Sequence, residues 1–238
     1  MNNLPPIREI NYLEGPQSRI NELWFTIKVA AQFIKGFRVL HFVGPCITIF
    51  GSARFKEDHE YYQSARRIGA HIAQLGFTVM TGGGPGIMEA ANRGARDVKG
   101  KSVGCNIQLP FEQEPNPYLD KFTNIKYFFV RKVLLIKYSY GLICMPGGFG
   151  TMDELFEVLT LIQTNMVKKY PVVIYGTKYH QKLIDYIHDM KQNGTISPED
   201  LDLFLITDNE DEVIKYISEK SIKPFGLKRK KKAKWLWE

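Results

Sequence analysis

The sequence has few of the features that mark secreted or membrane proteins. Its 238 residues include only three cysteines, Cys46, Cys105 and Cys144, an odd number, and each lies in a short apolar run that predicts a buried strand. The longest segment without Asp, Glu, Lys or Arg, residues 68–88, contains six glycines and a proline, so it does not predict a membrane span. The first residues also lack the basic and then apolar pattern of a secretory signal. We therefore expect reduced thiols and a cytoplasmic location.

The net charge of +7 is concentrated at one end of the chain. Residues 223–238 contain seven lysines and arginines and one glutamate, which leaves a charge of only +1 for the remainder. Such a basic tail could bind nucleic acid or an acidic membrane, with Trp235 and Trp237 available for stacking, or could be a disordered solubilising end. The overall charge therefore says little about the ligand of the main domain.

Short apolar runs alternate with longer segments of helical period, which predicts βαβ units in an α/β fold with a doubly wound, mostly parallel sheet. The predicted strands are 46–51, 77–81, 102–107, 124–129, 142–145, 172–175 and 203–207. The predicted helices are 62–75, 86–97, 131–140, 151–167, 181–192 and 209–220. Ser197 followed by Pro198 predicts the start of one more short helix. The prolines at 110, 115 and 117 predict a loop over residues 109–121.

An amphipathic helix is predicted before the first strand, within residues 17–40. Its apolar residues recur at helical spacing and are Ile20, Leu23, Trp24, Ile27, Ala31 and Ile34. We expect this face to cover either the edge of the sheet or a second subunit.

Two glycine-rich turns each join a predicted strand to a predicted helix, at residues 82–86 and 147–151. At the carboxyl end of a strand, glycine lets backbone N–H groups approach a ligand, and the N-terminus of the following helix attracts an anion. The two turns together predict a phosphate site. Neither turn has the lysine of a Walker loop or the glycine spacing of a standard NAD site, so we expect a phosphate that is bound and not transferred.

The residues at 146–154, Pro-Gly-Gly-Phe-Gly-Thr-Met-Asp-Glu, resemble the P-G-G-x-G-T-x-x-E signature of the LOG family. This family comprises cytokinin riboside 5′-monophosphate phosphoribohydrolases, formerly labelled lysine decarboxylases. The glycine motif at 82–90, the strand end at 51–54 and the Arg131 and Lys132 pair are similar to other motifs of the family, in the same order. The three glycines before Pro85 resemble its longer relatives, the nucleotide 5′-monophosphate nucleosidases.

The resemblance implies a Rossmann-like hydrolase domain over residues 43–222, preceded by an extension at 1–42 that holds the amphipathic helix and followed by the basic tail at 223–238. The implied activity is hydrolysis of the N-glycosidic bond of AMP or an N6-substituted AMP, giving the free base and ribose 5-phosphate, with no cofactor. The family also implies a homodimer or higher homo-oligomer, paired through the helices predicted at 131–140 and 151–167.

Glu154 and Arg131 are the catalytic residues that the resemblance implies. A carboxylate beside the ribose would stabilise the positive charge that develops as the base leaves, and it could orient or deprotonate the attacking water. The arginine stays protonated, so we expect it to donate hydrogen bonds and stabilise charge. The expected substrate-binding residues are Ser52, Gly83, Gly84, Glu89, Lys132, Gly147, Gly148, Gly150 and Thr151. The loop at 108–118 is expected to line the base pocket.

Other interpretations stay open from the residues alone. Thr151 and Glu154 have the spacing of a capping box, which only stabilises a helix, and Glu89 near a helix start favours the helix dipole. A non-enzymatic nucleotide-binding or molybdenum-cofactor carrier protein would need the same phosphate cradle, and the tail would suit an RNA-associated protein. The five histidines have no ligand spacing, so we expect no metal site, and His180 and His188 are expected on a solvated helix face.

Overall fold

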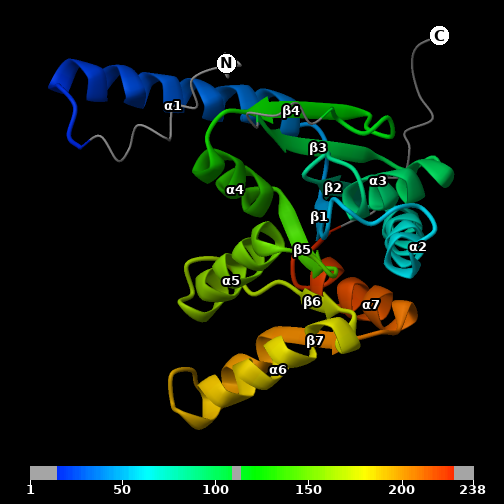
Figure 1. The fold of residues 1–238 in the computed structure, drawn as a ribbon. Helices are drawn as coiled ribbons and strands as arrows, with labels where there is room; N and C mark the ends of the chain where they lie inside the picture. Colours follow the sequence, from blue (N-terminus) through cyan, green and yellow to red (C-terminus); the bar gives the residue numbers. More distant parts are fainter. Residues whose placement is uncertain (1–14, 109–113, 228–238) are drawn as a thin grey trace.

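Seven parallel strands form one sheet in the order β4-β3-β2-β1-β5-β6-β7 (Figure 1). The computed structural model describes residues 15–108 and 114–227. The strands are β1 (Cys46–Phe50), β2 (Thr78–Thr81), β3 (Ser102–Ile107), β4 (Lys121–Ile125), β5 (Ser139–Cys144), β6 (Val172–Tyr175) and β7 (Phe204–Thr207). The strand order runs outward in both directions from the pair β1 and β5. This is the doubly wound, Rossmann-like sheet that the sequence predicts.

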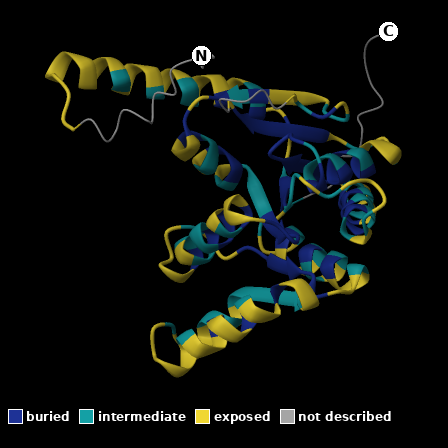
Figure 2. Ribbon diagram, in the orientation of Figure 1, coloured by how far each residue is buried: buried dark blue, intermediate teal, exposed yellow. Residues whose placement is uncertain are grey.

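Helices cover both faces of the sheet. One face packs against α2 (Glu60–Gln74), α3 (Ile87–Asp97) and α7 (Glu210–Ile217), and the other packs against α4 (Phe128–Lys137), α5 (Phe149–Gln163) and α6 (Thr177–Gln192). Figure 2 shows the central strands as the buried part of the molecule: β1, β2 and β3 are buried along their whole length, whereas the edge strands β4 and β7 are partly exposed. The predicted short helix is η2 (Pro198–Leu203), a 3-10 helix with Ser197 as its N-cap, and η3 (Ser218–Ile222) follows α7.

Two glycines let α2 and α3 pack unusually closely. Gly94 of α3 lies against the backbone of Arg66, and Gly69 of α2 lies against the backbone of Ala91. A Cβ atom at either position would overlap the facing main chain, so the close approach of these helices depends on glycine.

The strand predicted at 124–129 is wrong after Ile125, and β4 begins earlier than predicted, at Lys121. Phe128 and Phe129 begin α4, and Tyr127 is the extended residue before it. Aromatic residues favour strands locally, but Val130 and Leu134 are buried at helical spacing, so tertiary packing overrides the local preference. The helix consequently ends earlier than predicted, and Ser139 with Tyr140 belongs to β5.

The N-terminal helix α1 (Arg19–Leu40) lies along the edge strand β4 (Figure 1). The Lys35 ammonium donates to the Asn124 carbonyl at 2.7 Å, and the Lys126 N–H donates to the Gln32 side chain at 3.1 Å. The packed side chains differ from those predicted, because the helix has two apolar stripes. The residues of α1 that pack against the core are Phe25, Val29, Phe33, Gly36 and Leu40. The residues of the predicted apolar face are exposed, namely Ile20, Leu23, Trp24, Ile27, Ala31 and Ile34.

All three cysteines are free and buried in strands, as predicted. Burial raises the pKa of each thiol to about 12, so the thiols are protonated at neutral pH. No helix of residues 15–108 and 114–227 is long and apolar enough to cross a membrane. The basic residues 228–234 lie outside the described residues. Shortly before them, the ring of Phe225 packs on the ring of Tyr140, with the ring centroids 5.1 Å apart.

Candidate functional site

The first glycine turn is held by a buried network of polar side chains. The Thr81 hydroxyl donates to Asn92 Oδ1 at 2.6 Å and accepts the Gly83 N–H at 2.9 Å. The Asn92 amide then donates to Ser102 Oγ on β3 at 2.8 Å. Because each of these buried side chains has a partner, the turn is fixed at the carboxyl end of β2.

Asn116 ties the loop after β3 to the same turn. Its N–H donates to the Gly83 carbonyl at 2.8 Å, and its amide donates to the Gly84 carbonyl and to Asn92 Oδ1, each at 3.0 Å. Asn116 is buried although it lies in a loop. The base-pocket residues predicted at 108–118 are described only in part, since 109–113 lie outside the described residues.

The second glycine turn opens α5 directly. Gly148 is the N-cap residue, and its carbonyl accepts the N–H groups of Thr151 at 3.0 Å and Met152 at 3.1 Å. The helix therefore begins two residues earlier than predicted, and Thr151 is its third residue. Thr151 and Glu154 consequently do not form a capping box, and that alternative is wrong.

Two glycines of this turn are open to solvent. Gly148 and Gly150 are exposed, and a Cβ atom at either position would meet nothing within 4 Å. The N–H groups of Gly148, Phe149 and Gly150 donate to no other described residue, as expected for the first turn of a helix. Thr151, by contrast, is buried against Gly147.

Ser52 joins the two turns at the carboxyl end of β1. Its N–H donates to the Pro146 carbonyl and its carbonyl accepts the Ile87 N–H, both at 2.9 Å. Gly86, with φ of +69°, brings the first turn against the backbone of Ser52, where a side chain would overlap it. The turns predicted from sequence therefore meet at the same edge of the sheet.

Arg131 reaches across this edge from α4. Its Nε donates to the Cys105 carbonyl on β3 at 2.9 Å, and its guanidinium lies against Gly82, where a Cβ atom would overlap Nη2. Its Nη1 lies 3.8 Å from Glu154 Oε1 on α5. The arginine thus spans from the first glycine turn to the helix that follows the second.

Glu154 is a buried carboxylate that is only partly compensated. The residue is 2% exposed, and its Oε2 has no hydrogen-bond partner among the described residues. Burial raises the pKa of Glu154 from its ordinary 4.5 to about 7, although the charges of Arg131 and Lys132 lower it. A buried carboxyl group that titrates near neutrality is a candidate for a functional site.

Lys132 forms ion pairs with two other residues of α5. Its ammonium lies 2.9 Å from Asp153 Oδ1 and 3.0 Å from Glu157 Oε2. Burial lowers the pKa of Lys132, but these two carboxylates more than offset that and leave it raised. The pairs fix α4 against α5 on either side of Glu154.

Glu89 lies in the first turn of α3 and is held by a buried tyrosine. The Tyr62 hydroxyl donates to Glu89 Oε1 at 2.8 Å. Arg93, one turn later, forms an ion pair with Glu57 at 2.7 Å and lies over the ring of Tyr118. These contacts connect α3 to the loops after β1 and β3.

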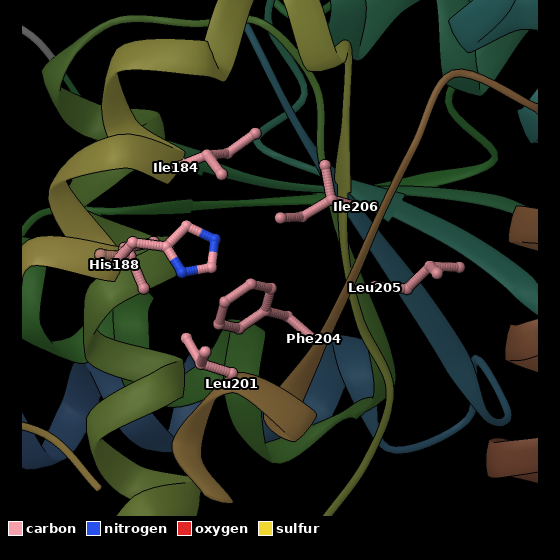
Figure 3. Close-up of a pocket in the computed structure, with 7 residues that line it drawn as sticks. Ile184, His188, Leu201, Phe204, Leu205 and Ile206 are labelled. Carbon is pink, nitrogen blue, oxygen red and sulfur yellow. The ribbon is translucent and has the colours of Figure 1, made fainter. Parts of the chain in front are cut away.

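A separate pocket of about 180 Å³ lies between α6, η2 and β7 (Figure 3). Its lining is apolar apart from one histidine and consists of Ile184, Ile187, His188, Leu201, Phe204, Leu205 and Ile206. None of the predicted site residues lines it. His180, predicted on a solvated face, is buried instead, because α6 begins at Thr177 and its first turn packs on the sheet.

Comparison with known proteins places this arrangement in a family. A family model described as "Possible lysine decarboxylase" matches residues 88–217, more than half of the chain and a range that includes Arg131 and Glu154. The chain belongs to this family, the LOG family. A cytokinin riboside 5′-monophosphate phosphoribohydrolase of Rhodococcoides fascians is 30% identical over 64% of this chain and 78% of its own length.

Two further comparisons extend the likeness, one in sequence and one in fold. A pyrimidine/purine nucleotide 5′-monophosphate nucleosidase of Escherichia coli K12 is 24% identical over 77% of this chain and 44% of its own length. The solved molybdenum cofactor binding protein of Rippkaea orientalis superposes with a TM-score of 0.56 at 21% identity, covering 75% of this chain and 98% of that one. The second likeness shows the shared fold alone.

Sequence reasoning about this LOG family protein missed three residues that hold the two turns. Asn92 and Asn116 bind the first turn, and the Tyr179 hydroxyl on α6 donates to the Gly147 carbonyl of the second at 2.9 Å. A lone asparagine or tyrosine carries no periodic signal. The proline-rich surroundings of Asn116 indicated only a loop, and Tyr179 precedes the helix start predicted at 181.

Proposed function

We propose that this LOG family protein hydrolyses the N-glycosidic bond of a nucleoside 5′-monophosphate, AMP or an N6-substituted AMP, to the free base and ribose 5-phosphate. The observation that carries this proposal is the position of Arg131, which contacts the first glycine turn and lies 3.8 Å from the buried Glu154 beside the second. The names of the relatives above support the same reaction class.

The second turn provides the 5′-phosphate cradle in this proposal. Neither backbone strain nor packing requires glycine at 148 or 150, since φ of Gly148 is −91° and the space around both is open. The absence of side chains at these two positions leaves the main chain open to a ligand that approaches from solvent. The free N–H groups and the positive end of α5 favour an anion, and Gly147 with Thr151 completes the loop.

Glu154 would stabilise the transition state electrostatically. As the base departs, positive charge builds on the ribose, and a carboxylate in a desolvated site attracts that charge more strongly than it attracts the neutral sugar. A pKa of about 7 also lets Glu154 accept a proton from the attacking water. The partnerless Oε2 is the atom available for either role.

Arg131 would bind and orient the substrate from the other side. Its bond to the Cys105 carbonyl holds the guanidinium in place, so its remaining N–H groups are preorganised donors. Arginine stays charged at neutral pH, which suits charge stabilisation and not proton donation.

The remaining predicted substrate contacts are assigned by position. Ser52, Gly83 and Gly84 lie at the edge where the turns meet, and Glu89, whose Oε1 accepts from Tyr62, would accept from the ribose hydroxyls. Lys132 would act through its charge, which lowers the pKa of Glu154, since its ammonium is engaged by carboxylates of α5.

The test is release of free base from a panel of purine and pyrimidine 5′-monophosphates. Glu154→Gln and Arg131→Ala should each reduce kcat/KM by at least about 100-fold, the usual loss for an electrostatic or acid–base group. Asp97→Asn is the matched control, because Asp97 pairs with Arg66 at the far end of α3. No release from any member of the panel by the wild-type protein would reject the proposed function.

We further propose a homodimer formed through α4 and α5, as the family resemblance implies. Large apolar side chains are exposed there, including Phe128, Val133 and Phe149, the last being 96% exposed. Light scattering of the purified chain at twice the monomer mass would support this, and a monomer would contradict it.

Single buried thiols in three strands support the predicted cytoplasmic location.

A further inference from the structure

The first turn of α6 supports the second glycine turn from behind. Gly176, with φ of +95°, lies against the Pro146 ring, where a Cβ atom would be 2.9 Å from Cγ. The Tyr179 hydroxyl donates to the Gly147 carbonyl at 2.9 Å. Within the first turn of α6, the Nδ1 atom of the buried His180 lies 3.1 Å from the Gly176 carbonyl.

The bond from Tyr179 sets the direction of one peptide group. In a trans peptide the carbonyl of one residue and the N–H of the next point in opposite directions. Since the Gly147 carbonyl faces Tyr179 on α6, the Gly148 N–H faces away from α6, on the exposed side of the turn.

This peptide is also the one in the turn that joins two glycines. Rotation of a peptide plane by half a turn changes ψ of the residue before it and φ of the residue after it. Gly147 and Gly148 both lack a Cβ atom, so the φ and ψ values of the rotated form are open to both residues. After rotation the Gly147 carbonyl would occupy the place of the N–H and would repel an anion there.

We propose that Tyr179 is a positioning residue for the phosphate cradle. Its hydroxyl holds the Gly147–Gly148 peptide in the orientation that presents an N–H group, and not a carbonyl, to the 5′-phosphate of the substrate. This inference rests on the proposed function, because it concerns the same site. Tyr179 is half exposed, and its hydroxyl would act through the peptide without touching the substrate.

The experiment compares Tyr179→Phe with Tyr186→Phe in the full-length protein. Tyr186 lies on the same helix, is 57% exposed and makes no hydrogen bond with another described residue. Both variants keep the aromatic ring, so thermal unfolding should show both folded. The probes are ribose 5-phosphate and inorganic phosphate, measured by calorimetry, and AMP, measured by base release.

Loss of one neutral hydrogen bond predicts about 3- to 10-fold weaker binding of both phosphate probes to Tyr179→Phe. The KM for AMP should rise by the same factor while kcat changes less than about twofold, whereas general loosening of the fold would lower kcat as well. Tyr186→Phe should match the wild type in every measurement.

The outcomes separate this inference from the proposed function. Wild-type hydrolysis of AMP with an unchanged KM and unchanged phosphate binding in Tyr179→Phe would overturn the positioning role alone. Weaker phosphate binding in Tyr179→Phe without any hydrolysis by the wild type would overturn the hydrolase and support the positioning role. A wild-type protein that neither binds the phosphates nor releases base would overturn both.

Discussion

Replacement of Glu154 by glutamine should remove activity and at the same time change how stability depends on pH. The pKa of Glu154 is raised from 4.5 to about 7 in the folded protein, because burial disfavours the charged form. The folded state therefore binds a proton more tightly than the unfolded state between these values, so wild-type stability falls as pH rises through that interval. Glutamine does not titrate, and the variant lacks this loss.

The magnitude follows from the two pKa values. Each pH unit between them changes the unfolding free energy by about 1.4 kcal/mol. The residue is nearly fully buried, so little of this is screened by solvent. Between pH 5 and pH 8, the stability of Glu154→Gln relative to the wild type should therefore increase by about 2 to 3 kcal/mol. Any constant cost of the buried amide cancels in this difference.

Urea unfolding at pH 5, 6, 7 and 8 measures the effect. Asp97→Asn is the control, because Asp97 pairs with Arg66 at the far end of α3 and is not among the charges that shift the pKa of Glu154. Loss of that partly exposed pair should cost about 0 to 1 kcal/mol with no comparable rise toward pH 8. A stability difference for Glu154→Gln that stays flat from pH 5 to pH 8 would refute the view that this carboxylate is held in a desolvated site.

Three further substitutions test the account of the turns and the packing. Gly148→Ala should change the unfolding free energy by less than about 1 kcal/mol, because the surroundings of Gly148 are open. The same substitution should weaken ribose 5-phosphate binding, and unchanged binding in calorimetry would contradict the proposed phosphate cradle. Gly94→Ala should destabilise the fold by about 1 to 3 kcal/mol in urea, since the new methyl group meets the Arg66 backbone, and a neutral result would show that α2 and α3 can separate. Asn116→Ala should lower the unfolding free energy by about 1 to 3 kcal/mol and raise the KM for AMP, because the buried Gly84 carbonyl loses its donor. An unchanged KM would show that this loop is not part of the substrate site.

The sequence by itself determined the order of strands and helices, the parallel sheet and the position of both glycine turns. Those features depend on local hydrophobic period and on glycine beside strand ends, and the structure confirms them. The chain motifs also identified the family, and with it Glu154 and Arg131 as the residues to test.

Only the tertiary structure decided the details that depend on distant contacts. Phe128 begins a helix because its neighbours pack inward. The helix α1 buries a different apolar stripe from the predicted one because that stripe faces the core beside β4 and α4. The bonds from Asn116 to Gly84 and from Tyr179 to Gly147 each join residues 32 positions apart. The raised pKa of Glu154 likewise comes from its burial in the folded protein, since desolvation is a property of the folded surroundings and not of the residue.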